Sequence, residues 1–185
     1  RRNRATSPIP SALLDAGSPG VGFWKDRFTS ECTYSSVQYS NDSIAPGTGL
    51  TFAARCVQST TASDRGFHLV GNPQVPTPVV SRSMPVTAGE TFDISLRGRV
   101  DNNRAMRFNY RFHDGTAWVT TNTITGAMSG TVVDGGWREW RITINVPTGV
   151  SYMDIMWVRN ENALAGEAME ASALMVGTVG APYFD

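Results

Sequence analysis

The sequence predicts an all-β protein in which two antiparallel sheets form a sandwich. Three observations favour this class: apolar residues recur at every second position, turn-forming residues occupy the breaks between these segments, and only one segment has helix-forming composition. A period of two is typical of strands that bury one face, and many short strands separated by turns indicate a sandwich or barrel. The length of 185 residues suits one domain, which we expect to span residues 1–185.

The first half of the chain holds short candidate strands, followed by a segment of regular alternation. The candidates lie at residues 22–24, 34–39, 50–57, 67–70 and 79–84. In the next segment, 91–100, every second residue is apolar, so we expect the following side chains to point inward: Phe92, Ile94, Leu96 and Val100.

Four further strands follow in the second half. Residues 106–112 alternate and end at an Asp-Gly turn, and 140–146 alternate and end at Pro-Thr-Gly. Residues 152–159 are apolar on both faces, which is typical of a central strand, and 173–179 form the last strand. Residues 161–174 have helix-forming composition, but Gly166 inside them favours a loop with at most one helical turn.

Charge and hydropathy exclude several classes of partner. The chain has 16 basic and 16 acidic residues, so it has no overall field that would attract nucleic acid or an anionic membrane. Its apolar runs fall far short of the ~20 residues of a transmembrane helix. The basic residues at 1–4 precede Ser-Pro-Ile-Pro instead of an apolar segment, so we expect no secretory peptide.

The two cysteines and two histidines do not indicate a catalytic or zinc site. Cys32 and Cys56 are too few for a disulfide scaffold or a four-ligand zinc site, and their spacing leaves open whether they form a disulfide. Neither His68 nor His113 lies in a recognisable sequence motif that pairs a histidine with a nucleophile. His113 ends a strand just before a turn, so we expect it at the surface. No glycine-rich loop precedes a helix, so a phosphate-binding loop is not indicated. We therefore expect no enzymatic activity.

Four segments, in order, resemble the carbohydrate-binding modules of the jelly-roll, galactose-binding-like type. These are the opening at 3–11, Gly-Phe-Trp at 22–24, the turn Met-Pro-Val-Thr-Ala-Gly-Glu-Thr at 84–91, and the strand from Gly-Trp to Val-Pro at 136–147. The resemblance covers nearly the whole chain. It implies a jelly-roll sandwich that binds a glycan without catalysis.

The last residues resemble a narrower group. Gly-Ala-Pro-Tyr-Phe-Asp at 180–185 is similar to the junction behind such modules in minor tail proteins of phages that infect actinobacteria, and Asn-Arg-Ala-Thr-Ser-Pro at 3–8 fits that group. The resemblance implies a virion tail module, present in several copies, whose partners are host-surface polysaccharide and other tail proteins. Two alternatives stay open: a module of a secreted glycoside hydrolase, and an architectural domain that binds no sugar.

The same resemblance implies a structural calcium ion, although no cofactor is required. Family members often carry an acidic pair in the final strand, where this chain has only Glu170, and Asp15 is the other carboxylate that we would nominate. The alternative is that both are solvated loop charges.

Polar residues between the inward positions of the middle strands predict a ligand surface. If these strands present one common face, forked donors and two indole rings could hold sugar hydroxyls and a pyranose ring. The candidates are Trp118, Trp137, Arg107, Arg111, Glu139 and Arg141. The alternative is an ordinary solvated sheet face. The other tryptophans, Trp24, Trp140 and Trp157, are expected in the core.

Overall fold

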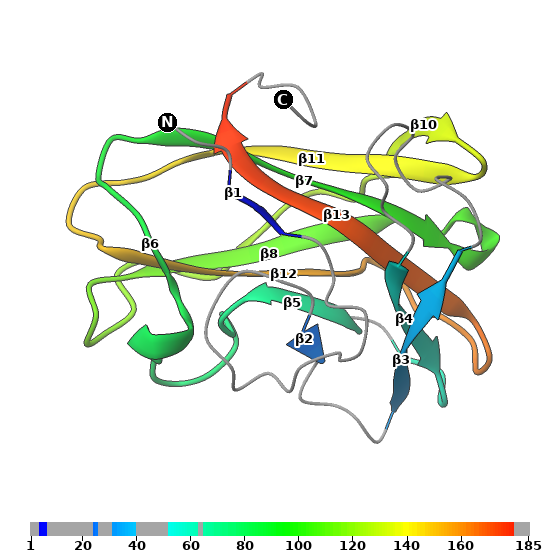
Figure 1. The fold of residues 1–185 in the computed structure, drawn as a ribbon. Coiled ribbons are helices and arrows are strands. Elements are labelled where there is room, and N and C mark those ends of the chain that lie inside the picture. Colours follow the sequence, from blue (N-terminus) through cyan, green and yellow to red (C-terminus); the bar gives the residue numbers. More distant parts are fainter. Residues whose placement is uncertain (1–3, 7–23, 26–30, 40–51, 63–64, 180–185) are drawn as a thin grey trace.

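Two antiparallel sheets packed face to face form the protein, as the alternation predicts. The computed structural model describes residues 4–6, 24–25, 31–39, 52–62 and 65–179. Figure 1 shows one layer with β11, β7 and β13 above a second layer with β8, β12 and β5. In the described part, helical structure is limited to the short 3₁₀ turns η1 (Val80–Arg82) and η2 (Asp101–Asn103), and no helix there is long and apolar enough to cross a bilayer.

The upper layer is a seven-stranded sheet. In spatial order its strands are β10 (Thr131–Asp134), β11 (Trp137–Asn145), β7 (Thr91–Val100), β13 (Ala168–Thr178), β4 (Phe52–Gln58) and β3 (Cys32–Gln38), and β1 (Arg4–Thr6) also pairs with β13. Strand β7 turns Phe92, Ile94 and Leu96 toward the core between the layers as expected, although Asp93 and Ser95 on its other face are also buried. Its other face carries Arg97 and Arg99 toward the outside of the sandwich.

The lower layer is a six-stranded sheet. In spatial order its strands are β2 (Trp24–Lys25), β5 (Gly66–Val70), β12 (Tyr152–Arg159), β8 (Met106–His113) and β9 (Thr123–Ile124), and β6 (Met84–Pro85) also pairs with β12. Strand β12 is central and almost fully buried, as its apolar character predicts.

Two expectations for the elements are wrong. The last strand begins at Ala168 rather than Ala173, because its alanine- and methionine-rich start pairs with β7 on one side and β4 on the other. Tertiary pairing therefore overrides the helix-forming composition. Residues 79–84, expected as a strand, contain η1 and only the beginning of β6.

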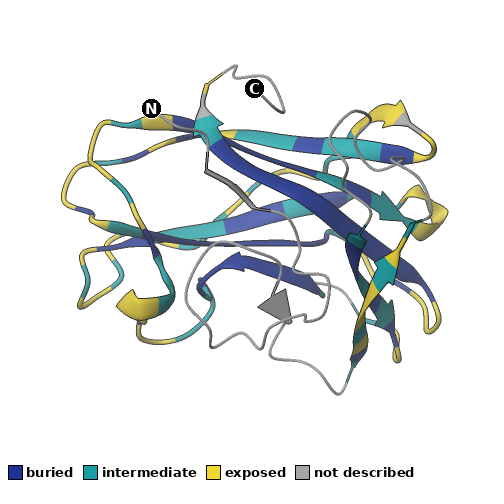
Figure 2. Ribbon diagram, in the orientation of Figure 1, coloured by how far each residue is buried: buried dark blue, intermediate teal, exposed yellow. Residues whose placement is uncertain are grey.

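Stacked aromatic rings fill the core between the sheets. Trp157 lies parallel to Phe67 with 6.5 Å between ring centroids, and edge-on to Trp140 at 5.1 Å. Both tryptophans are buried, which confirms their expected place. Figure 2 shows buried residues in dark blue along the strands of both layers. The side chain of Trp24 lies outside the described residues. Gly98 on β7 lets these rings approach, because a Cβ there would lie 2.8 Å from Cη2 of Trp157.

Both cysteines are free thiols buried on the core side of β3 and β4. Cys32 lies opposite Gln58, and Cys56 lies opposite Tyr34, so the two cysteines are diagonal neighbours. Hydrogen bonding to Cys56 and burial raise the pKa of Cys32, whereas hydrogen bonding to Cys32 lowers the pKa of Cys56. The spacing left open whether Cys32 and Cys56 form a disulfide, and in this structure they do not.

Candidate functional site

The six predicted ligand residues do not share one face. Arg107 and Arg111 lie on β8 of the six-stranded sheet, whereas Glu139 and Arg141 lie on β11 of the seven-stranded sheet. The expectation of a common face is wrong, because alternation fixes the side of a strand but not the sheet to which the strand belongs. Whether any of these residues binds a ligand stays a prediction.

Trp137 lies on the outer side of its sheet but is covered. Only 1% of its surface is exposed. Tyr39 packs edge-on against the indole at 5.5 Å, and the guanidinium of Arg99 lies 5.6 Å from the ring centroid. A covered ring cannot stack on a pyranose, so Trp137 supports the surface from beneath.

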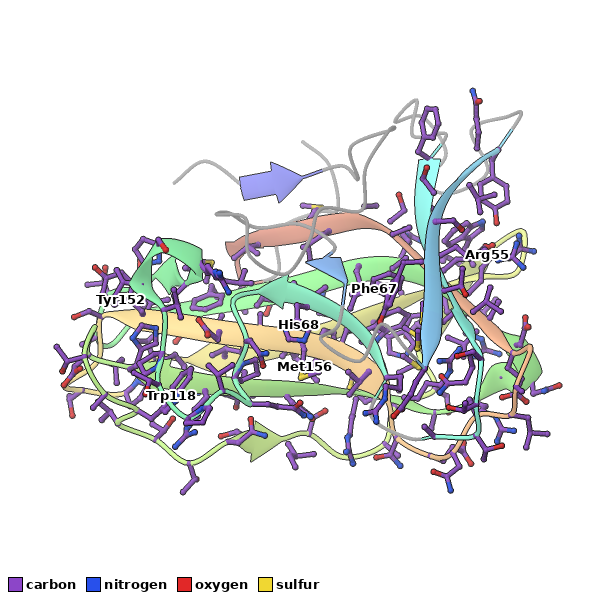
Figure 3. The ribbon with its side chains drawn as sticks, turned by 90° about the horizontal axis from the view of Figure 1, so that it is seen from below. Arg55, Phe67, His68, Trp118, Tyr152 and Met156 are labelled. Carbon is purple, nitrogen blue, oxygen red and sulfur yellow. The ribbon has the colours of Figure 1, made fainter. Side chains whose placement is uncertain are left out.

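Trp118 lies in a separate aromatic group on the six-stranded sheet. Its indole nitrogen donates to the Val75 carbonyl at 2.9 Å, and the guanidinium of Arg111 lies 4.6 Å from its ring centroid. Figure 3 shows Trp118 and Tyr152 toward one end of the molecule and Arg55 toward the other. Two separate candidate surfaces follow, one around Trp118 and Arg111 and one on the seven-stranded sheet.

Glu139 and Arg141 form part of a charged row on the outer face of the seven-stranded sheet. Arg141 Nε lies 3.1 Å from Glu139 Oε1, and Asp93 Oδ2 lies 3.9 Å from Arg141 Nη1. The row borders a shallow depression of about 510 Å³, which is also lined by residues 128–131. Ion pairs of this kind are common on ordinary solvent-exposed faces of sheets, so the charged row alone does not identify a binding site.

A second hollow lies at the end of this sheet, and we call it the arginine hollow. It encloses about 380 Å³. Its lining includes four arginines, two acidic residues, two asparagines, a serine and a phenol: Arg55, Arg99, Arg104, Arg138, Asp101, Glu170, Asn102, Asn103, Ser129 and Tyr39. Pairing of β7, β13 and β4 builds its floor, because Glu170 lies opposite Arg99 on one side and opposite Arg55 on the other.

Contacts within the hollow hold its guanidiniums in place. Arg55 lies 3.6 Å from Glu170, which also accepts a hydrogen bond from the Tyr39 hydroxyl. Burial and the Glu170 carboxylate raise the pKa of Tyr39, so the phenol stays a donor. Arg138 donates to the carbonyl oxygens of Ser129 and Gly130, at 3.1 and 3.3 Å.

Glu170 does not resemble a calcium ligand in this setting. Its carboxylate is taken by the Tyr39 hydroxyl and the Arg55 guanidinium, and a nearby cation disfavours a second cation. The part of the chain that the structure describes contains no group of three metal-ligating side chains. Asp15 lies outside the described residues, so a calcium site with Glu170 stays a prediction.

His113 is fully buried, so the expectation of a surface histidine is wrong. Its Nε2 lies 2.8 Å from Ser83 Oγ and 3.8 Å from Asp154 Oδ1, while its Nδ1 accepts from the Gly115 amide at 3.2 Å. One ring nitrogen therefore faces both the serine and the aspartate, whereas a hydrolase triad uses the two nitrogens separately. Burial lowers the pKa of His113 and raises that of Asp154, so both neutral forms are favoured.

Comparison with known proteins shows the fold and leaves the family open. No protein-family model matches the sequence, and no curated protein does. The CBM22-1 and GH10 modules of Clostridium thermocellum xylanase 10B match with a TM-score of 0.52 and 10% identity, over 82% of this chain and 25% of that chain. The fold is a sandwich of two antiparallel β-sheets that resembles the sandwich of carbohydrate-binding modules.

Two further solved structures are similar at lower scores. The xylan-binding CBM22-1 domain of Paenibacillus barcinonensis Xyn10C has a TM-score of 0.47 and 12% identity, over 96% of this chain and 97% of that domain. The enzymatically active domain of bacteriophage CBA120 tailspike protein 4 has a TM-score of 0.48 and 13% identity, over 90% of this chain. This chain spans about a fifth of that tailspike chain, 21%.

The sequence alone does not reveal most of the arginine hollow. Alternation within residues 91–100 places Arg99 on the outward side of its strand, but nothing in the sequence pattern distinguishes Arg55, Arg138 and Tyr39. They meet only because β3, β4, β7, β11 and β13 converge at one end of the sheet. To predict that Arg55 belongs to this hollow, one would need to know the register of β4 and β13, because that register places Arg55 opposite Glu170.

Proposed function

We propose that this protein is a non-catalytic module of a phage tail that binds host-surface glycan through the arginine hollow. One observation carries the proposal: an open hollow on a sheet of carbohydrate-binding-module fold is lined by guanidinium, amide, hydroxyl and phenol groups. Sugar hydroxyls both donate and accept, so they need such a mixed set of partners. The volume of about 380 Å³ falls in the range of small-molecule pockets.

The edge of the hollow provides both kinds of polar partner. Asn102 and Asn103, the last two residues of η2, adopt left-handed backbone conformations, with φ of 58° and 50°, and line the rim of the hollow. Asn103 Oδ1 accepts from Arg138 Nη2 at 3.4 Å. Beneath them Tyr39 and Trp137 brace Arg99, whose guanidinium offers forked donors to a ligand.

The placement in a phage tail rests on the resemblance of residues 3–8 and 180–185 to tail-protein segments. A single module of this kind binds weakly, because each hydrogen bond contributes about 1 kcal/mol. Several copies on one particle would raise the effective affinity by roughly 10²-fold or more. Host polysaccharide and neighbouring tail proteins are therefore the proposed partners, and the virion is the proposed location.

Two alternatives predict different neighbours and different binding. A module of a secreted glycoside hydrolase would bind that enzyme's polysaccharide and lie beside a catalytic domain. An architectural domain would bind no glycan even when many copies are displayed. The surface around Trp118 and Arg111 is a second candidate site, because it joins a half-buried indole to a guanidinium.

The test is binding of the module, displayed in many copies on beads, to a glycan array and to host cell-wall polysaccharide. Arg99→Gln removes a guanidinium of the hollow, and Arg111→Gln makes the same change at the other candidate surface. We expect the wild type and Arg111→Gln to bind alike and Arg99→Gln to bind at least several-fold more weakly. Thermal unfolding of each variant controls for loss of fold.

Other results would redirect the proposal. If Arg111→Gln loses binding and Arg99→Gln keeps it, the site lies at Trp118 instead. If the multivalent wild type binds no glycan, the architectural alternative replaces glycan binding.

A further inference from the structure

The cations of the arginine hollow differ in how they are neutralised. Arg104 Nε lies 2.6 Å from Glu167 Oε2, and Arg55 is paired with Glu170. Among the described residues, Arg99 and Arg138 have no carboxylate partner: Arg99 contacts the rings of Tyr39 and Trp137, and Arg138 donates to carbonyl and amide oxygens. The hollow therefore holds two guanidiniums whose charge is not cancelled by a direct ion pair.

The carboxylates of the lining offset this charge only in part. Asp101 Oδ2 accepts from the Ala168 amide at 2.8 Å, and Glu170 is already engaged by Arg55 and Tyr39. Arg104 is offset by Glu167 and Glu161 outside the lining, and Arg55 by Glu170. Arg99 and Arg138 therefore outnumber the one remaining carboxylate among the described residues of the lining, Asp101, although the chain as a whole has a formal net charge of zero. The excess is thus local, which favours a ligand with a local negative charge over a long polyanion such as nucleic acid.

The backbone keeps Arg99 at the surface of the hollow. Gly136 has φ of 81°, and a Cβ at this position would lie 3.2 Å from Arg99 Nη2. Because Gly136 has no side chain, the Arg99 guanidinium can lie beside the turn between β10 and β11. Aromatic rings under Arg99 restrict its side chain, so less conformational entropy is lost when it binds a ligand.

We propose that the arginine hollow binds the anionic group of an acidic polysaccharide, a carboxylate or a phosphate ester, through Arg99 and Arg138. The inference rests on the proposed function and names the class of glycan. A guanidinium presents parallel donors that match two oxygens of a carboxylate or phosphate, and such charge-assisted hydrogen bonds are about twice as strong as neutral ones. Asn102 and Ser129 lie in the same lining, so the Asn102 side-chain oxygen and the Ser129 hydroxyl are available to hydroxyls beside the anionic group.

The experiment compares three polymers: polygalacturonate, its carboxyl-reduced form with the same linkages, and a glycerol phosphate polymer. Binding of the displayed module is measured by biolayer interferometry. Losing one charge-assisted pair should weaken binding about tenfold. We expect Arg99→Gln and Arg138→Gln to lose this factor for the acidic polymer and to lose much less for the reduced form, while Arg111→Gln behaves as wild type.

Glu170→Gln provides a test in the opposite direction. This change removes a negative charge from the hollow but keeps an oxygen that can accept from Tyr39, so acidic polymers should bind several-fold more tightly. Preference for polygalacturonate identifies a carboxylate, and preference for the phosphate polymer identifies a phosphate ester; both support the inference. Equal binding of acidic and reduced forms overturns it and leaves glycan binding intact, whereas no binding to any glycan overturns the proposed function as well.

Discussion

Replacing Gly98 with alanine should destabilise the sandwich at the contact between its two sheets. The new methyl group would lie 2.8 Å from Cη2 of Trp157, 3.0 Å from Cζ3 of Trp140 and 3.0 Å from the backbone oxygen of Glu170. All three neighbours are packed, so relief requires a shift of a ring or a strand. Overpacking of this kind costs about 1–3 kcal/mol, which corresponds to a fall in Tm of roughly 2–12 °C for a chain of this size.

Urea unfolding of four variants tests this reasoning. Gly126→Ala is the matched control, because nothing lies within 4 Å of a Cβ there, and its effect should stay within about 0.5 kcal/mol. Trp157→Phe removes the atom nearest to the new methyl, so the double variant should be more stable than the sum of the single effects by at least about 0.5 kcal/mol. A Gly98→Ala protein as stable as the control, or strictly additive effects, would refute the packing argument.

Two further predictions follow from buried groups. Because burial lowers the pKa of His113, its protonation favours the unfolded chain, so the free energy of unfolding should fall as the pH drops below the usual histidine value of about 6.5. Urea midpoints measured against pH should show this loss in the wild type and less of it in His113→Gln; a flat wild-type profile contradicts it. Cys32 and Cys56 should react with a thiol reagent only after unfolding, since both are buried. Rapid reaction of the native protein, or no free thiols after unfolding without a reductant, would show that this arrangement is wrong.

Alternation in the sequence was enough to predict the main strands. In β7 the apolar residues Phe92, Ile94 and Leu96 form one buried face, as a period of two requires. The start of β13 was missed because its residues favour a helix when considered alone. Its two neighbouring strands stabilise it as a strand, and this information lies far away in the sequence.

The ligand surface was harder to predict because it depends on strand pairing. Arg111 and Arg141 each occupy an outward position, yet they lie on opposite layers of the sandwich. The outward side of Trp137 also follows from alternation, but Tyr39, one residue beyond the end of β3, covers the ring. The arginine hollow combines residues separated by more than a hundred positions, so only the folded topology brings them together.

Chemical-shift mapping tests the central claim most directly. Backbone and arginine side-chain resonances of the ¹⁵N-labelled protein would be followed while the glycan selected by the array is added. Glycan binding in the hollow predicts that the largest changes fall at Arg99, Gly136 and Arg138, with little change at Arg111 and Trp118. Changes confined to Arg111 and Trp118, or none at saturating glycan, would contradict the account.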